Sequence, residues 1–478
     1  MAKVVRLLKS KNIIVYLLSF SASLVGIGLN FFLARVLGSE NYGRIQFLVA
    51  LATTCSQILI FGLNFFLIRE ARNKKHNGEV VNKCFSLFLT IVLFFVPIVY
   101  YVLNNHINET QNNLLMIISV IAVSILMGFS ALVSSYYQGN GKYHFSLIID
   151  SLLPKLIMLL TAIAFLSLGK MSQFQDKYLL IYIIVYGAIT IPFVFKLIKR
   201  FNLSFEFSEI KSICFFFGVT ITYSLGNNLT KVLQGTLFHN DVALGIVSVS
   251  ISIVSLVTVF TSVLDNLVKP IFAKKSREND KDGLLDSYRF VTRTNMYVAL
   301  PLYLFFIIHP SRFLGIFGST YLEYPMILSF IAMANAVNNI TGPNGTMLAM
   351  TGKEKFELFN GFIYFGVYFV AIFAFSFASI YGLSIALLVS QVVVNIAKYS
   401  ETWYFFKKNP LNKKTLLSIA IVFAFDFAAI WALKYIPLGL IYWLLIGGAV
   451  GVGIVLMNTF VVSLYGRNDF KTLLKLKL

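Results

Sequence analysis

The chain has 478 residues, of which 58% are hydrophobic and only 13% are charged, and its mean hydropathy is +0.79. Soluble domains carry roughly 25% charged residues, so a water-soluble fold would leave more apolar surface than its core could bury. The formal net charge of +20 comes from short Lys and Arg clusters between apolar runs. Because these clusters form no continuous basic face, nucleic acid is excluded as a partner.

Apolar runs long enough to cross about 30 Å of hydrocarbon follow one another along the whole chain. They predict an all-α polytopic membrane protein with about fourteen transmembrane helices. Two pairs of runs, at Tyr381-Gly382 and at Tyr435-Ile436-Pro437, are divided on turn residues and length, so twelve or thirteen spans stay open. The predicted spans cover residues 13–34, 44–67, 84–103, 114–137, 146–168, 178–198, 212–236, 242–268, 290–309, 324–350, 358–379, 381–405, 414–435 and 437–464.

The Lys and Arg residues orient these spans. With the N-terminus inside, 31 of the 40 lie in inside segments, six in outside segments and three within spans. Positive charge accumulates on the cytoplasmic side of membrane proteins, so both termini are predicted to be cytoplasmic and the number of spans to be even. The loops are too short for a soluble catalytic domain, which predicts a protein that acts within the membrane and is not an enzyme.

Motifs for cofactors and metals are missing from the sequence. The segment GNGK at 139–142 lacks the leading glycine and the final Ser or Thr of a P-loop, so ATP hydrolysis is not expected. The three cysteines form neither a CxxC metal site nor a disulfide framework. We therefore expect no cofactor and no metal.

A weak internal repeat divides the chain. The segment NYG at 41–43 opens a span with a basic end, and ALG at 243–245 opens another about two hundred residues later. Transporters are often built from such repeats, with the substrate site between them. We expect a six-helix lobe over 1–200, a second over 201–406 and two additional helices over 407–478.

Asparagines recur at helical spacing within several predicted spans. Polar residues in a span are costly unless they face the bundle interior or water. They favour a wet cavity whose amides contact the substrate, whereas hydrogen bonds between helices are the alternative. The candidate substrate-binding asparagines are Asn30, Asn64, Asn227, Asn228, Asn335, Asn338 and Asn339.

Three cations lie within predicted spans. Lys155 and Lys231 occupy the bodies of their spans, where a lysine costs about 2.5–3.5 kcal/mol on insertion scales. A cationic cavity around them would attract a phosphate or diphosphate, and Arg293 is a weaker third candidate. The alternatives are ion pairs with Asp150 or Asp265 for the lysines, and snorkelling of the side chains to the interface.

Two further features concern coupling and motion. Asp426 is the deepest acidic residue, and it is either a carrier of a coupling proton or a packing partner. Gly342 and Pro343 lie inside the tenth span, where they should interrupt the helix and form a hinge.

Several segments resemble one family of transporters. ARVLGSENYG at 34–43 resembles the ARxLGxxxYG turn of polysaccharide flippases, and GLN at 62–64 with IRE at 68–70 resembles the end of their second span. TGK at 351–353 and YGLSIA at 381–386 resemble two later turns of the same family. Two departures are a lysine at 231, where members often carry an acidic residue, and Ser384 in place of a glycine.

This resemblance is to Wzx-type O-antigen and polysaccharide flippases of the multidrug/oligosaccharidyl-lipid/polysaccharide superfamily. It implies two lobes around a cationic cavity in a bacterial inner membrane. It also implies alternating access, with undecaprenyl-diphosphate-linked oligosaccharide, an O-antigen (lipopolysaccharide) or capsule repeat unit, moved from the cytoplasmic to the periplasmic leaflet. Implied partners are this substrate, membrane lipids, and polysaccharide polymerase and chain-length proteins.

Two other functions stay open. An ion-coupled small-molecule antiporter of the same superfamily would need an acidic cavity, whereas the cations of this chain predict a basic one. A membrane glycan polymerase or transferase would need a long periplasmic loop with catalytic groups, and the outside loops here are about ten residues long. The flippase is therefore the favoured hypothesis.

Overall fold

The computed structural model describes residues 11–70, 77–106, 113–375, 380–409, 411, 413–437 and 439–465. In this part of the chain every regular element is helical, because a bilayer offers no water to satisfy the backbone and a helix pairs its own polar groups. Eleven of the described helices are long and apolar enough to cross a membrane. The predicted all-α, polytopic membrane fold is confirmed.

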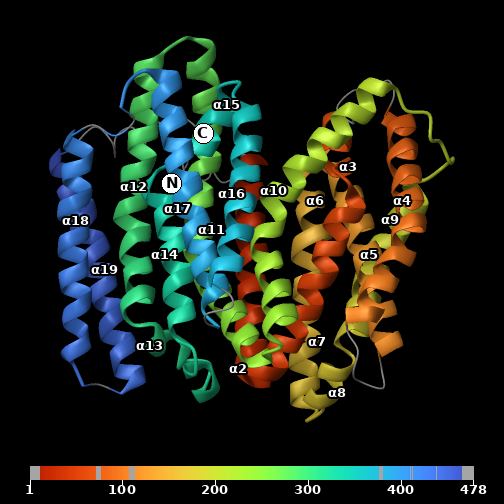
Figure 1. Cartoon of the computed structure of the whole chain (residues 1–478), viewed down its shortest axis with the longest axis horizontal. Coiled ribbons are helices and arrows are strands. Elements are labelled where there is room, and N and C mark those ends of the chain that lie inside the picture. The colour runs from red at the N-terminus through yellow and green to blue at the C-terminus, as the bar shows by residue number, and fades with distance from the viewer. Residues whose placement is uncertain are drawn as a thin grey trace. The chain divides into compact units, whose positions relative to one another are not determined.

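The chain forms two compact units, Met1–Gly245 and Ile246–Leu478. The predicted lobes over 1–200 and 201–406 stay a prediction. The helices of the first unit are coloured red to yellow-green in Figure 1. They are α2 (Lys11–Ile60), α3 (Leu63–Glu70), α4 (Asn77–His106), α5 (Asn113–Gly139), α6 (Tyr143–Leu147), the π-helical turn η1 (Ile148–Leu152), α7 (Leu153–Ser167), α8 (Met171–Asp176), α9 (Tyr178–Leu197) and α10 (Phe207–Phe238).

Helix α2 contains the first predicted span and most of the second, which continues into α3. It is bent at Gly38, whose φ of 76° and ψ of 171° are not helical. Glycine adopts a positive φ without a steric penalty, so the helix changes direction there without ending. α2 packs against α5, α7 and α10, and α5 also packs against α4 and α9. The first segment of α2, before Gly38, therefore lies within reach of side chains from several helices.

The ARVLGSENYG segment packs closely against the start of α11 (Asp241–Arg277). A side chain on Gly43 would collide with the backbone of Asp241, and one on Gly245 would meet the backbone of Ser39. The guanidinium of Arg44 donates to Asp241 Oδ2 over 2.8 Å. Close backbone packing therefore accounts for Gly43, whereas the positive φ at the bend accounts for Gly38.

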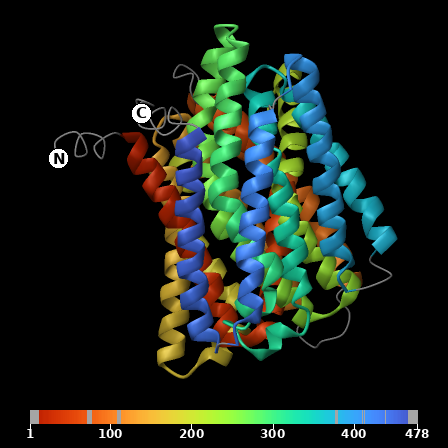
Figure 2. The same cartoon turned by 90° about the vertical axis from the view of Figure 1, so that its left-hand side faces the viewer.

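The second unit continues α11 and adds the green to blue helices of Figure 1. α12, α14 and α17 pack in series, and α16 packs on α17. α18 and α19 both pack against α12, as Figure 2 also shows. The elements are α12 (Lys281–Ile308), α13 (Pro310–Leu314), the 3-10 turn η2 (Ser319–Leu322), α14 (Met326–Ile340), α15 (Asn344–Met350), α16 (Glu354–Phe375), α17 (Gly382–Phe406), α18 (Lys413–Ala432), the 3-10 turn η3 (Leu433–Tyr435) and α19 (Leu440–Tyr465).

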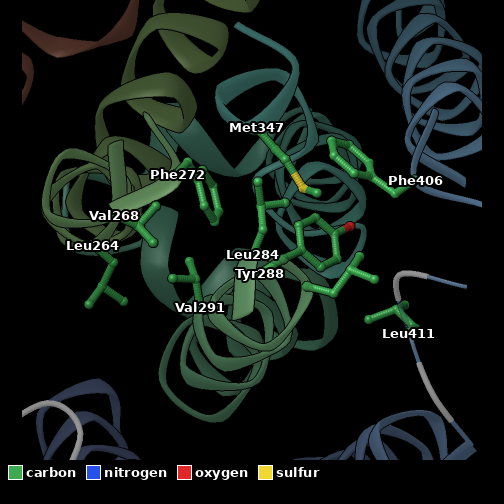
Figure 3. Close-up of a cluster of buried hydrophobic side chains, with 10 residues drawn as sticks. Leu264, Val268, Phe272, Leu284, Tyr288, Val291, Met347, Phe406 and Leu411 are labelled. Carbon is green, nitrogen blue, oxygen red and sulfur yellow. The ribbon is translucent and has the colours of Figure 1, made fainter. Parts of the chain in front are cut away.

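A buried apolar cluster joins α11, α12, α15 and α17 in this unit (Figure 3). Phe272, Tyr288 and Met347 are fully buried in it, and burying side chains of this size contributes about 1.5–3 kcal/mol each when they leave water. The short helix α15 is thereby fixed to α11 and α12, which matters because α15 follows the interruption predicted at Gly342-Pro343.

Candidate functional site

Lys231 of α10 is tied to both segments of α2. Its ammonium donates to Gln46 Oε1 over 2.9 Å. The amide of Gln46 in turn donates to Asn30 Oδ1 over 3.2 Å. Asn30 lies before the bend of α2 and Gln46 lies after it. One network therefore connects two predicted site residues, Lys231 and Asn30, through a residue that the sequence analysis did not single out.

The charge of Lys231 has no counter-ion among the described residues, since no carboxylate there lies within 4.0 Å of its ammonium. An ammonium has three donors, and Gln46 accepts one of them. A cation away from water is costly unless it is paired. The surroundings of Lys231 are therefore suited to an anionic ligand.

Lys155 follows an irregular stretch of helix. The π-helical turn η1 contains Asp150, whose Oδ1 accepts a hydrogen bond of 3.1 Å from Ser130. Pro154 then begins α7 directly before Lys155. Asp150 is close enough for its charge to act on Lys155, although the two form no ion pair within 4.0 Å. Such π-helical turns are frequent at functional sites.

The side chain of Lys155 lies along Gly26 of α2. A Cβ placed on Gly26 would stand 3.0 Å from Cδ and 3.2 Å from Nζ of Lys155. The absence of a side chain at position 26 is what gives the lysine this place. Gly26 and Asn30 are four residues apart, so they share one helix face at a rise of about 6 Å.

Lys155 and Lys231 therefore approach the same face of α2 from two different helices. Lys155 lies at Gly26, and Lys231 reaches Asn30 one turn further along through Gln46. The sequence predicted each lysine separately, from the cost of a charge within a span. Their convergence is a property of the folded unit.

A second glutamine, Gln234, brings a buried amide without hydrogen-bond partners among the described residues to this region. Gln234 of α10, one turn after Lys231, is fully buried, and neither atom of its amide has a hydrogen-bond partner within the described part of the chain. The next residue, Gly235, packs on the ring of Phe47, beside Gln46. A buried amide without partners costs about 1–3 kcal/mol, which marks Gln234 as part of a polar site.

The other candidate asparagines of the first unit are Asn64, Asn227 and Asn228. Asn64 is on α3, and its Oδ1 is buried without a partner among the described residues. Asn228 is half-buried on α10, one turn before Lys231. The side chain of Asn227 lies outside the described part of the structure. Among the described asparagine side chains of this unit, Asn30 alone is linked to a lysine by hydrogen bonds, through Gln46.

Two asparagines of the second unit donate hydrogen bonds to carbonyls of their own helix, α14. The amide of Asn339 donates to the hydroxyl of Tyr303 over 3.0 Å and to the carbonyl of Asn335 over 2.9 Å. Asn335 donates to the carbonyl of Ile331 over 2.9 Å, while Asn338 is exposed. Asn339 thus makes the hydrogen bond between helices that was the alternative stated above, whereas Asn335 bonds within α14. Contact of these asparagines with a substrate stays a prediction.

The helix is interrupted where Gly342 and Pro343 stand, between the end of α14 and the start of α15. Gly342 has a φ of 82°, and a Cβ on it would collide with Thr292 and lie 2.9 Å from the ring of Tyr288. The Tyr288 hydroxyl contacts the freed carbonyl of residue 341, and Asn344 Oδ1 lies 2.8 Å from the same hydroxyl. The interruption is thus fixed by α12, and its function as a hinge stays a prediction.

Asp426 makes its hydrogen bonds with α19 and not with the asparagines of α14. Asp426 on α18 is fully buried, and the amide of Asn458 on α19 donates to its two oxygens over 3.2 and 3.1 Å. The same amide lies 3.4 Å from the carbonyl of Tyr297 on α12. These contacts favour packing of α18 and α19 on α12 as the role of Asp426. Arg293 is half-buried on α12.

Metal ligands do not gather in the described residues, which contain no group of three or more His, Cys, Asp or Glu that could hold an ion. The chemistry of the first unit is therefore that of two ammonium groups, two glutamine amides and an asparagine. Groups of this kind are able to bind and orient an anion with polar substituents.

Comparisons with known proteins identify the fold. The structure of the lipid II flippase MurJ in an inward closed conformation matches with a TM-score of 0.67 at 13% identity, over 95% of this chain and 99% of that chain. An inward-facing multidrug resistance MATE family transporter of the MOP superfamily matches with a TM-score of 0.59 at 13% identity, over 82% and 94%. The MATE multidrug transporter DinF-BH matches with a TM-score of 0.57 at 14% identity, over 85% and 96%. None of the curated proteins searched matches the chain.

The fold defines a multi-pass membrane protein of the architecture found in MurJ and the MATE transporters. The sequence profile of the family described as "Polysaccharide biosynthesis protein" matches residues 32–326, more than half of the chain. The chain belongs to this family. The family resemblance stated from the sequence motifs is confirmed.

Proposed function

We propose that this protein is a flippase that moves undecaprenyl-diphosphate-linked oligosaccharide, an O-antigen or capsule repeat unit, from the cytoplasmic to the periplasmic leaflet by alternating access. The observation that carries the proposal is the convergence of Lys155 and Lys231 on one face of α2. A diphosphate offers oxygens on two phosphorus atoms, so it can accept hydrogen bonds from two ammonium groups at once.

The energetics support an anionic ligand of this kind. At an effective dielectric constant of about 20, two unit charges 4 Å apart attract by about 4 kcal/mol. Lys231 has no resident carboxylate among the described residues, so this attraction stays available to a ligand. Glutamine and asparagine amides can donate to and accept from sugar hydroxyls. The lysines would then hold the diphosphate, while Gln46, Gln234 and Asn30 contact the glycan.

The proposed setting is a bacterial inner membrane with both termini in the cytoplasm. The distribution of Lys and Arg supports this orientation. Reporter fusions at each terminus should be active on the cytoplasmic side. Activity of either fusion on the periplasmic side would contradict the proposed orientation. Polymerase and chain-length proteins are the proposed partners, because they act on the transported repeat unit.

The test removes both charges. The double variant K155Q/K231Q should abolish surface glycan and accumulate lipid-linked oligosaccharide in the inner leaflet, with protein level unchanged. K142Q removes an exposed lysine of the same unit and should leave surface glycan intact. Normal surface glycan in the double variant at normal protein level would refute the proposal.

The two alternatives predict different results. An ion-coupled antiporter would export a cationic drug, and export that survives in K155Q/K231Q while glycan is unaffected would favour it. A glycan polymerase or transferase would incorporate labelled sugar when purified. The flippase predicts neither drug export nor sugar incorporation.

A further inference from the structure

The connection between α9 and α10 is extended, yet it is held firmly on α4. Asn82 Oδ1 accepts hydrogen bonds from the backbone amides of Lys199 and Arg200 over 3.0 and 3.4 Å. Ser86 Oγ accepts one from the amide of Asn202 over 2.8 Å. The connection therefore has a defined conformation without a helix of its own, at the end of the first unit where α9 stops and α10 starts (Figure 1).

The acidic residues near this connection are already engaged. Glu206 and Glu209 form a capping box at the N-terminus of α10, in which the backbone amide of Glu206 donates to Glu209 Oε2 over 2.8 Å. Lys83 of α4 lies 3.4 Å from Glu209. These carboxylates serve the helix start and α4, so they do not neutralise the cations of the connection.

Those cations are Lys196, Lys199 and Arg200. All three side chains are exposed, and none forms an ion pair with a described residue. Large aromatic side chains follow them in the chain. Phe201 is 65% exposed and Phe207 is 83% exposed, which is unusual for phenylalanine next to water. We call Lys196, Lys199, Arg200, Phe201, Leu203 and Phe207 the linker patch.

The combination of exposed aromatic rings and unpaired cations is that of a surface that lies in a membrane interface. Apolar side chains enter the boundary between headgroups and acyl chains, and Lys and Arg stay with the phosphates. The patch also continues the surface of α9, where Phe195 is 81% exposed at the end of a candidate span. A lipid leaflet is thus the partner that contacts both the helix and the connection.

We propose that the linker patch binds anionic phospholipid headgroups and anchors the α9–α10 connection to the leaflet surface. The distribution of Lys and Arg assigns this end of the unit to the cytoplasm, where the leaflet surface is negative. Because hydrogen bonds to Asn82 and Ser86 fix the backbone of the connection, lipid binding does not have to order it first. The patch shares no residue with the Lys155–Lys231 site and does not depend on the proposed substrate.

The test measures lipid binding by the purified full-length protein. Native mass spectrometry should show tight binding of phosphatidylglycerol and weaker binding of phosphatidylcholine. K199Q/R200Q should weaken phosphatidylglycerol binding by about tenfold or more, since each cation near an anionic surface contributes about 1 kcal/mol. The variant F201S/F207S should weaken binding of both lipids, because it removes the inserted apolar groups.

A matched control removes two exposed cations elsewhere. R277Q/K281Q has the same charge change on a polar turn of the second unit and should bind phosphatidylglycerol like the wild type. K199R/R200K keeps the charges and should also bind normally. Equal lipid binding by K199Q/R200Q and wild type, at equal melting temperature, would overturn the proposal. Displacement of the lipid by millimolar inorganic phosphate would also overturn it, since the site would then bind free phosphate.

Discussion

A methyl group added at Gly26 tests whether the position of Lys155 matters. The added Cβ of G26A would stand 3.0 Å from Cδ, 3.2 Å from Nζ and 3.3 Å from Cε of Lys155. Such contacts are too short, so the flexible lysine must move. Helix stability should not fall, because alanine is the better helix former by up to about 1 kcal/mol. The expected effect is therefore on the site and not on the fold.

The magnitude follows from the displacement of the ammonium. The contacts of the added Cβ require Lys155 to move by a few tenths of an ångström. Moving a charge pair from about 3.0 to about 3.3 Å apart at an effective dielectric constant of about 20 costs about 0.5 kcal/mol. That energy corresponds to about twofold in affinity or rate. We expect G26A to lower transport of the lipid-linked oligosaccharide by about twofold at unchanged protein level and melting temperature, measured as surface glycan or as flipping in vesicles.

The control is two residues away on the same helix. Gly28 is exposed, and a Cβ there would meet no atom within 4 Å, so G28A adds the same methyl group without touching a lysine. G28A should transport like the wild type. If G26A and G28A behave alike, the approach of Lys155 to α2 has no functional meaning and the site assignment is wrong.

Three further predictions concern the second unit. Glu357 and Lys398 form a largely buried ion pair of 2.5 Å. E357Q leaves the lysine charge unpaired and should lower the free energy of unfolding by about 3–5 kcal/mol. The double variant E357Q/K398M removes both charges and should recover much of this loss in thermal unfolding. Y288F removes the hydroxyl at the α14–α15 interruption and should cost about 1–3 kcal/mol by the same assay, whereas no loss would show that this hydrogen bond is dispensable. Asp280 caps α12 by accepting from the amide of Gly283 over 2.9 Å, and this hydrogen bond holds the pKa of Asp280 below its ordinary value of 3.8. A lowered folded-state pKa gives stability that is complete above pH 3.8 and is lost as the pH falls through the folded-state pKa, so D280N should flatten the acid limb of the melting-temperature profile.

The sequence determined the class of fold because composition decides the solvent. A chain with 58% hydrophobic residues in long runs must place them in lipid, and in lipid the backbone must be helical. The same physics located the interruption at Gly342 and Pro343, since proline lacks the amide that a helix interior needs. It also marked Lys155 and Lys231, because a charge in a span is costly wherever the span is placed.

Only the tertiary structure decided which of these residues meet. Helical spacing assigns Gly26 and Asn30 to one face of α2, but it does not say which helix covers that face. Gln46 is one of three amide residues in its predicted span, and nothing in the sequence linked it to Lys231. The partner of a buried polar group is set by packing between helices that lie far apart in the chain. For that reason the cost of each lysine could be predicted from its own span, whereas the site that they form together could not.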